Sequence, residues 1–190
     1  MELTTDYFID DIFQLEAEGI FQDIMVSTLL KKYLKNLNQL KVDRVTQYIK
    51  NIFKEYYKLG NLNVLIYDKN TTLYGYAFFF TSPSLSQIYL HKIFVYEQYR
   101  NKGLGRKILS DLSDNGTITL LCPKNKENFY VKNNFKYIRS FETSNNKNFQ
   151  MSKILYTGLS VMCNSSEQNN ISIFLLDDTD IKNIANVLRI

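Results

Sequence analysis

The sequence predicts an α/β layer fold in which a sheet is flanked by helices. Two observations lead to this prediction. From residue 62 onward, short runs rich in β-branched and aromatic residues recur between polar turns, as expected of strands. Before and between these runs, apolar residues recur at steps of three and four, as on one face of a helix. Such helices bury their apolar faces on a sheet, so the pattern indicates a layered domain.

The first third of the chain is expected to be helical. Residues 1–23 contain seven Asp or Glu residues and no Lys or Arg, with a weak apolar helical face. We expect a short acidic helix there, with a break at Gly19. Residues 26–40 also have a helical pattern, and residues 42–56 predict an amphipathic helix. Gly60 follows that helix as the residue that ends it in the left-handed conformation.

Three strands are expected next. The first two, Leu62–Tyr67 and Leu73–Thr81, flank the turn-forming residues Asp68–Thr71 and so predict an antiparallel hairpin. The third strand is Gln87–Val95. Regular alternation along it would put one set of side chains on a single face: Tyr89, His91, Ile93 and Val95.

A glycine turn connects this strand to a helix. The turn has the pattern Arg100-x-x-Gly103-x-Gly105, and apolar residues recur at helical spacing from Leu104 to Leu112. Glycine lets the backbone approach a ligand, and the first N–H groups of a helix have no partner within it. The helix dipole and nearby basic residues, including Lys102, favour an anion. The turn is therefore predicted to bind phosphate or pyrophosphate, although it matches neither a P-loop nor the Gly-x-Gly-x-x-Gly dinucleotide fingerprint.

The remaining chain predicts alternating strands and helices. We expect a buried strand at Thr117–Cys122 and a helix that Asn125 caps and that Asn133-Asn134 ends in the left-handed conformation. The later elements are expected as a hairpin and a strand–helix pair: Phe135–Glu142 with Phe149–Leu155, then 171–176 and 178–188.

Two segments resemble motifs of the GNAT superfamily of N-acetyltransferases. The strand, glycine turn and helix resemble its motif A, in which the turn holds the pyrophosphate of acetyl-coenzyme A. The segment Asn125-x-x-Asn128-Phe129-Tyr130-x-Lys132-x-x-Phe135 is similar to its motif B, with Asn134 in place of the usual glycine. The order of elements also matches, so the resemblance implies a GNAT-like fold, with a mixed, mostly antiparallel central sheet flanked by helices. On this basis, residues 1–156 are expected to form the acetyltransferase domain. Residues 157–190 would be a strand–helix extension that completes the sheet or swaps into that of a partner.

The resemblance implies an N-acetyltransferase that moves an acetyl group from acetyl-CoA to a primary amine. Tyr130 matches the family's tyrosine and would act as general acid; its phenol is protonated at neutral pH. His91 or water would act as base, and Tyr89 and His91 occupy places similar to those of histidines in arylalkylamine N-acetyltransferases. The implied cofactor-binding residues are Ile93, Phe94, Val95, Arg100, Asn101, Lys102, Gly103, Leu104, Gly105, Arg106, Asn125, Asn128, Tyr130 and Lys132.

Composition narrows the function classes. The 190 residues are 45% hydrophobic and 22% charged, as in a single globular domain. No apolar run approaches the roughly 18 residues of a membrane helix, and the acidic start is no secretory signal, so we expect a cytoplasmic protein. Two cysteines, expected as buried thiols, and one histidine give no basis for a metal site.

The charge distribution leaves some alternatives open. Residues 92–139 hold ten Lys or Arg against four Asp or Glu, although the whole chain has a net charge of only +4. A polyphosphate cofactor explains this concentration better than nucleic acid, because the basic residues lie around the glycine turn. The main alternative is a non-catalytic acetyl-CoA sensor or scaffold of the same fold. The acceptor stays open between a small-molecule and a protein amine, and the resemblance allows a homodimer.

Overall fold

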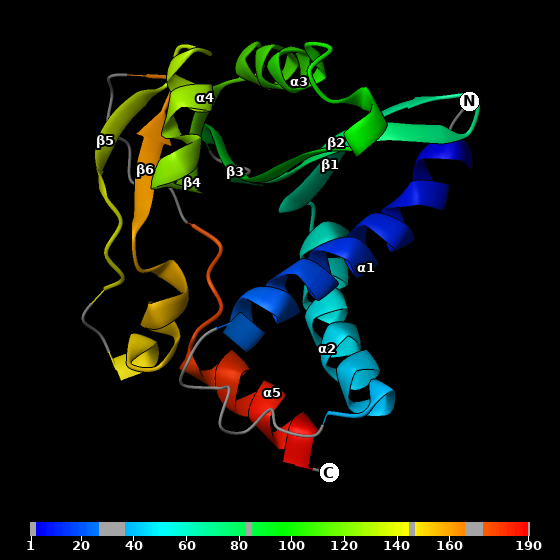
Figure 1. The fold of residues 1–190 in the computed structure, drawn as a ribbon, viewed down its shortest axis with the longest axis vertical. Helices are drawn as coiled ribbons and strands as arrows, with labels where there is room; N and C mark the ends of the chain where they lie inside the picture. Colours follow the sequence, from blue (N-terminus) through cyan, green and yellow to red (C-terminus); the bar gives the residue numbers. More distant parts are fainter. Residues whose placement is uncertain (1–2, 27–36, 83–84, 145–146, 166–172, 190) are drawn as a thin grey trace. The chain divides into compact units, whose positions relative to one another are not determined.

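The protein folds into two compact units. The computed structural model in Figure 1 describes residues 3–26, 37–82, 85–144, 147–165 and 173–189. The first unit comprises Met1–Thr5, Tyr57–Phe141 and Gly158–Phe174. The second comprises Asp6–Tyr56, Glu142–Thr157 and Leu175–Ile190. Within the described residues, no helix combines the length and the apolar character that crossing a membrane requires.

The first unit contains a six-stranded sheet with the order β1-β2-β3-β4-β6-β5. Among its described strand pairs, β3 and β4 run parallel and the other four pairs run antiparallel. The predicted mixed, mostly antiparallel sheet is therefore confirmed. The strands are β1 Leu62–Lys69, β2 Thr72–Ser82, β3 Leu85–Val95, β4 Thr117–Pro123, β5 Lys136–Ser140 and β6 Leu159–Cys163.

The first hairpin closes through a two-residue turn. Asn70 and Thr71 have φ angles of 51° and 60°, while Lys69 pairs with Thr72. Two consecutive residues with positive φ give a type I′ turn, whose twist matches that of the adjoining strands. The hairpin predicted at this place is confirmed, with the turn confined to the last two of the four expected residues.

A β-bulge at His91 changes the facing of β3. Phe78 pairs with Lys92, whereas the next residue, Phe79, pairs with Leu90, so His91 is the extra residue. Residues after the bulge consequently face the opposite side from the one that strict alternation predicts. The prediction that Tyr89, His91, Ile93 and Val95 share a face is wrong for the last two, which pack on the core together with Leu90.

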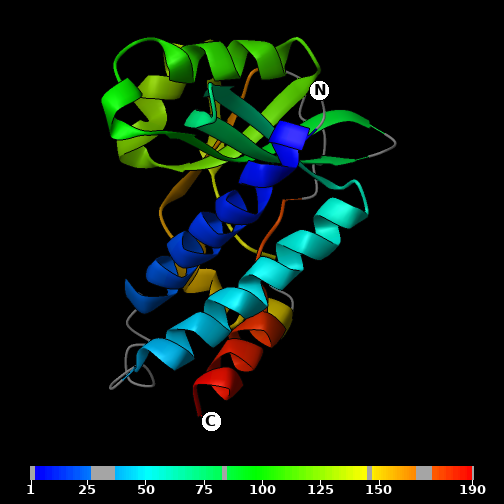
Figure 2. The ribbon, with the colours of Figure 1, turned by 90° about the vertical axis from the view of Figure 1, so that its right-hand side faces the viewer.

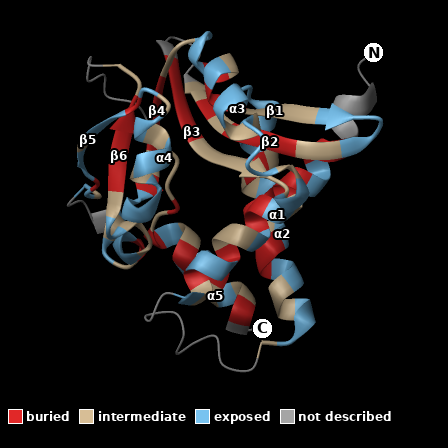
Figure 3. Cartoon of the chain, turned by 45° about the horizontal axis from the view of Figure 1, so that its top comes forward, coloured by how far each residue is buried: buried red, intermediate tan, exposed pale blue. Residues whose placement is uncertain are grey.

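Helix α3, Leu104–Ser113, lies against one face of this sheet, as Figure 2 shows. Its buried residues Ile108, Leu109 and Leu112 pack on a core that includes Ile118 and Leu120 of β4. Figure 3 shows buried residues along β3 and β6, two strands that are not at the edges of the sheet. A 3-10 turn, η1 Glu97–Tyr99, precedes α3, and η2 Lys124–Lys126 leads into the short α4, Glu127–Val131.

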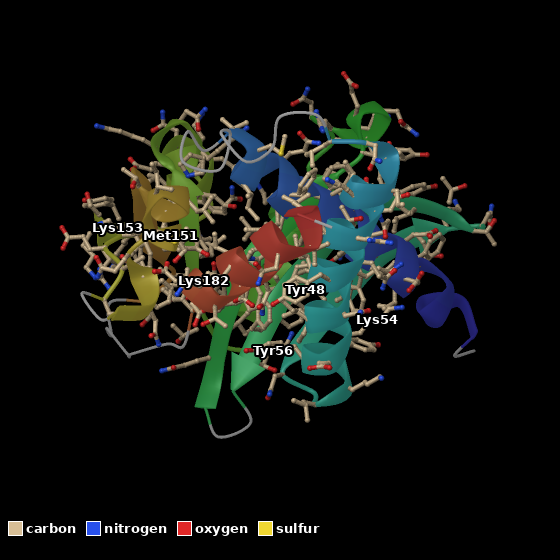
Figure 4. The ribbon with its side chains drawn as sticks, turned by 90° about the horizontal axis from the view of Figure 1, so that it is seen from below. Tyr48, Lys54, Tyr56, Met151, Lys153 and Lys182 are labelled. Atoms are coloured by element: carbon tan, nitrogen blue, oxygen red, sulfur yellow. The ribbon has the colours of Figure 1, made fainter. Side chains whose placement is uncertain are left out.

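The second unit is mainly helical. It contains most of α1 Leu3–Val26 and α2 Gln39–Lys58, together with η3 Lys147–Phe149, η4 Ser152–Tyr156 and α5 Asp178–Arg189. Asp10 of α1 forms ion pairs of 2.7 Å with Lys50 and Lys54 of α2. Figure 4 shows Lys54 and Tyr48 on α2 and Lys182 on α5. The Tyr48 hydroxyl donates to the Asp180 carboxylate at 2.9 Å, which ties α2 to α5.

Two predictions near the chain ends are wrong. Helix α1 continues through Gly19, where burial of the neighbouring Ala17 and Phe21 outweighs the roughly 1 kcal/mol cost of a helical glycine. Residues 173–177 form no strand, and residues 171–172 lie outside the described residues. Most of the helix predicted at residues 26–40 also lies outside them. The helix predicted at 178–188 is confirmed as α5.

The strand predicted at Phe149–Leu155 is also wrong. The carboxylate of Asp178 accepts the backbone N–H groups of Gln150, Met151 and Ser152 at 2.8–3.1 Å, and these bonds hold the segment in a turn. The partner of β5 is instead β6, which lies between β4 and β5. Strand β6 lies within residues 157–190, the predicted extension, and pairs with β4 and β5; the domain boundary between residues 156 and 157 stays a prediction.

Candidate functional site

The backbone between β3 and α3 presents a row of unpaired amide groups. The N–H groups of Tyr99 and Arg100 donate within η1, and that of Lys107 donates to the Gly103 carbonyl at 3.0 Å. Across the described part of the chain, no acceptor is recorded for the amides of residues 101–106. Gly103 precedes α3 with φ of 82°, a left-handed conformation that favours glycine. The turn can therefore donate several hydrogen bonds to an anion, as its sequence predicts.

The basic side chains around this turn have different partners. Arg100 donates from Nε to the Val95 carbonyl at 2.9 Å, so its guanidinium is anchored to the end of β3. The ammonium of Lys102 lies 5.7 Å from the centre of the Tyr99 ring. Lys107 is directed elsewhere, because its ammonium pairs with Asp111 at 2.9 Å. Arg100, Lys102 and Arg106 are exposed and remain the basic residues closest in sequence to the amides.

Gly105 lets α3 and α4 approach each other closely. A Cβ atom at Gly105 would lie 3.2 Å from Cζ of Phe129, which is tighter than an ordinary carbon contact. Phe129 belongs to α4, and its ring lies 5.1 Å from that of Tyr130. Because Gly105 has no side chain, α4 can pack close to the start of α3, and this packing sets the position of Tyr130 on α4.

The residues predicted on the second motif surround α4. Asn125 lies in η2, Asn128 in α4, and Lys132 at the end of α4, and all three are exposed. Asn125 does not cap the helix: α4 begins after Lys126, without a side-chain cap. Asn134 has φ of 67°, so the predicted left-handed end of this segment is confirmed.

Strands β3 and β4 separate beyond Leu90. Their parallel pairing runs from Gln87 with Thr117 to Leu90 with Leu120, although β3 continues for five more residues. The Tyr96 N–H donates to the Tyr74 carbonyl at 3.1 Å. Because hydrogen-bonded pairs alternate in an antiparallel ladder, the peptide groups of Ile93 and Val95 point away from β2. They therefore face the opening between β3 and β4.

Tyr130 lies on the α3 face of the sheet, packed against the same core as Ile93, Val95 and Leu104. Its ring also lies 5.7 Å from that of Phe135. Burial, with a smaller effect of Cys122, raises the pKa of the Tyr130 phenol well above its ordinary value of 10.0. The phenol is therefore protonated at neutral pH and available as a proton donor.

His91 and Tyr89 face the other side of the sheet from Tyr130. Among the described residues, several aromatic rings lie near the His91 ring, with centroid distances of 5.7–6.3 Å: Phe78, Phe80, Tyr89 and Phe174. Its Nδ1 is buried and has no hydrogen-bond partner within the described residues. Burial, reinforced by the charge of Lys92, lowers the pKa of His91 from 6.5 to about 4. The imidazole is thus neutral at physiological pH and can accept a hydrogen bond.

Sequence reasoning missed Phe129, Phe174 and Gly75. A Cβ at Gly75 would lie 2.5 Å from the Phe94 carbonyl oxygen, so only glycine fits beside the end of β3. A glycine inside a strand pattern signals such a close approach. Phe174 carries no comparable signal, because its contact with His91 joins residues far apart in the sequence.

Cys122 and Cys163 are free and buried, as predicted, and burial raises the pKa of the Cys122 thiol to about 11. No group of three or more His, Cys, Asp or Glu residues suited to a metal ion is found among the residues that the structure describes.

Comparison with known proteins gives one family match. Residues 60–137 match the family model described as an acetyltransferase (GNAT) domain. No curated protein sequence matches the chain significantly.

Similar solved structures are acetyltransferases of low sequence identity. PaiA N-acetyltransferase from Thermoplasma acidophilum, in complex with coenzyme A, is 12% identical over 83% of this chain and 92% of its own, with a TM-score of 0.49. A Bacillus subtilis acetyltransferase in complex with CoA is 16% identical over 60% and 82%, with a TM-score of 0.44. A spermidine N-acetyltransferase variant from Vibrio cholerae is 12% identical over 62% and 73%, with a TM-score of 0.46.

Proposed function

We propose that this protein transfers an acetyl group from acetyl-CoA to a primary amine, on the premise that residues 60–137, which match the model of the acetyltransferase (GNAT) domain, form such a domain. The observation that supports this most is the run of amides without acceptors at residues 101–106, directly after the strand whose pairing with β4 has ended. One surface thus offers donors for a diphosphate and, beside it, free strand edges for an extended amide-containing arm.

The residues present fit this cofactor. The amides of residues 101–106, with exposed Arg100, Lys102 and Arg106 nearby, would hold the diphosphate. The peptide groups of Ile93 would bond to the pantetheine arm. The Val95 carbonyl already accepts from Arg100, so only the Val95 N–H remains, as a donor to the thioester carbonyl. Asn125, Asn128 and Lys132 would border the arm from the side of α4.

When bound, acetyl-CoA supplies the acetyl group as a thioester. The nitrogen of a neutral amine forms a bond to the carbonyl carbon, and the carbon–sulfur bond breaks. Tyr130 would give its phenolic proton to the leaving sulfur, because its raised pKa keeps it protonated until that step. The Val95 N–H would polarise the carbonyl oxygen.

The proton lost by the amine needs an acceptor. His91 would be neutral and its Nδ1 lacks a partner, so it can accept a hydrogen bond from the amine or from a bridging water. A pKa of about 4 makes it a weak base, however, so we assign the final removal of the proton to water. Tyr89, buried beside His91, would orient the imidazole instead of relaying protons.

The acceptor class follows from less direct observations. Residues 1–23 carry seven acidic and no basic residues, which favours a cationic amine, either a small molecule or a protein amine. Asp10 is already paired with Lys50 and Lys54, so it contributes little to this attraction. We also propose that the protein is cytoplasmic and forms a homodimer.

Binding measurements with a matched pair of variants test the cofactor site. Gly103 and Gly158 have φ of 82° and 80°, and a Cβ at either position would meet no atom within 4 Å. Gly103→Val and Gly158→Val therefore impose similar backbone strain. We expect calorimetry to show that acetyl-CoA binding is lost in Gly103→Val and kept in Gly158→Val. Equal binding by both variants would contradict the placement of the diphosphate.

A second arm of the experiment separates the function classes. The wild-type protein is incubated with acetyl-CoA and a panel of primary amines, and free thiol is measured. Release of thiol that depends on an amine supports the transferase, whereas tight binding without transfer to any amine supports the sensor. Excess DNA or RNA should not displace acetyl-CoA, and displacement would favour a nucleic-acid surface.

A further inference from the structure

A hollow lies in the first unit, beside the C-terminal half of α3. Its volume is about 480 Å³, within the range of small-molecule sites. Its apolar lining includes Leu65, Phe79 and Leu112, so it lies between α3 and the sheet. Leu112 is eight residues from Leu104, which places it about 12 Å along the helix from the proposed diphosphate site.

Gln87 is a buried residue of this hollow whose side-chain oxygen lacks a hydrogen-bond partner within the described part of the chain. This side chain lines the hollow, is only 7% exposed, and its Oε1 has no hydrogen-bond partner among the described residues. Buried polar atoms are nearly always bonded in folded proteins, so an unbonded one that borders a cavity calls for an explanation. A ligand that donates to Oε1 would supply the missing bond.

The other polar groups of the hollow offer mainly acceptors. Asn63 uses its Nδ2 to donate to Thr81 Oγ1 at 2.9 Å, and Asn115 uses its Nδ2 to donate to the Asp111 carbonyl at 2.7 Å. The Nδ2 group of each side chain therefore already donates one hydrogen bond, whereas the side-chain oxygens can still accept hydrogen bonds. A guest that brings its own N–H donors suits this lining better than one that brings acceptors.

Asp111 adds a carboxylate to the rim. It accepts from the Tyr67 hydroxyl and from Lys107 at 2.9 Å, both through Oδ2. These two bonds lower the pKa of Asp111, and the bond from Tyr67 has the larger effect. The carboxylate therefore stays ionised at neutral pH. Because Lys107 balances the charge, the rim attracts a hydrogen-bond donor without requiring a full positive charge.

We propose that this hollow is a binding site for a small molecule that carries N–H donors, such as a primary carboxamide or an amine, on an apolar body. The N–H group would donate to Gln87 Oε1, and the apolar part would lie along Leu65, Phe79 and Leu112. This site is separate from the acetyl-CoA site, and the inference does not depend on acetyl transfer.

Three probes that share a five-carbon chain test the donor requirement. Pentanamide presents neutral N–H donors, pentylamine presents a cationic donor, and methyl pentanoate has a similar length but no donor. Each is titrated into the 15N-labelled full chain while amide resonances are followed. We expect pentanamide and pentylamine to shift the resonances of Gln87, Asp111 and Asn115, and methyl pentanoate to leave them unchanged. Equal shifts from all three probes, or from none, would overturn the proposal.

Two variants link those shifts to Gln87. Gln87→Leu removes the unbonded acceptor while keeping the size of the side chain, so it should fold with an undiminished melting temperature and weaken pentanamide binding at least about tenfold. Gln22→Leu, at an exposed position of α1, is the matched control and should bind as the wild type does. If Gln87→Leu unfolds, Gln87→Glu provides the second test, because it keeps an acceptor and should retain pentylamine binding. Unchanged pentanamide affinity in folded Gln87→Leu, or loss of pentylamine binding in folded Gln87→Glu, would refute the assignment.

Discussion

One inserted residue, His91, decides which side chains of β3 meet which face of the sheet. Without the bulge, Ile93 and Val95 would lie beside His91; with it, they join the core under α3. The same bulge lies where the pairing of β3 with β4 ends at Leu90. A bulge bends its strand and increases local twist, which accounts for the separation of the two strands at the proposed site.

Tyr130 supports a prediction about turnover. Tyr130→Phe removes the proposed proton donor but keeps the ring that packs on Phe129 and Phe135. We expect acetyl-CoA affinity to change little and kcat to fall by about 10² or more, as is usual for loss of a general acid. Steady-state kinetics and calorimetry measure the two effects. Tyr137→Phe, at an exposed position of β5, is the control, and similar turnover in both variants would remove Tyr130 from the mechanism.

His91 supports a prediction about pH and stability. Its pKa is about 4 in the folded protein and near 6.5 when unfolded, so the unfolded chain binds more protons between these values. Stability should therefore fall as pH drops from about 6.5 towards 4, by at most about 3 kcal/mol. The lowered pKa values of Asp10, Asp111 and Asp178 cause losses only at lower pH, below about 3.8.

Urea unfolding at several pH values checks this expectation. His91→Phe replaces the imidazole by a ring that suits its aromatic neighbours and does not titrate. Its stability should vary less than that of the wild type over the window from about 4 to 6.5. Parallel pH profiles for the two proteins would show that His91 does not remain neutral in the fold.

At the scale of elements, the contact between Gly105 and Phe129 joins α3 to α4. Gly105→Val would press a branched side chain into the Phe129 ring, where even a Cβ would lie at 3.2 Å. We expect a loss of about 1–3 kcal/mol of stability and weaker acetyl-CoA binding, because overpacking moves α4. Chemical denaturation and calorimetry measure the two losses.

The double variant Gly105→Val with Phe129→Ala isolates this contact. Removing the ring makes room for valine, so part of the stability lost in Gly105→Val should return. A double-mutant cycle compares the double variant with both single variants. Strictly additive losses would mean that the two residues do not interact.

At the scale of the whole molecule, charge is distributed unevenly. Residues 92–139 carry an excess of six positive charges, so the rest of the chain has a net charge of −2. A polyanionic cofactor bound near this segment should be held partly by exposed charges, which salt screens. We expect acetyl-CoA affinity to fall severalfold between roughly 0.05 and 0.5 M salt. S-acetyl-pantetheine, which lacks the diphosphate, should bind with little salt dependence, and equal salt dependence would argue against electrostatic binding of the diphosphate.

The sequence alone determined the local elements and the glycine turn. The hairpin, helix α3 and the left-handed residues Gly60 and Asn134 follow from residue types and spacing, because neighbours in the chain impose them. The mostly antiparallel sheet followed from the resemblance of two segments to GNAT motifs. Residue types and spacing are sufficient to predict a helix face, a turn or a hairpin, because the geometry of each depends on residues that are close in the sequence.

Only the tertiary structure decided which distant segments meet. It placed β6 between β4 and β5, held residues 150–152 on Asp178 in place of the expected strand, and inserted His91 as a bulge. It also brought Phe174 beside His91 and left Gln87 without a partner next to a cavity. These features depend on long-range packing and hydrogen bonds, whose energies outweigh local preferences. No periodic pattern of residues in the sequence marks such contacts.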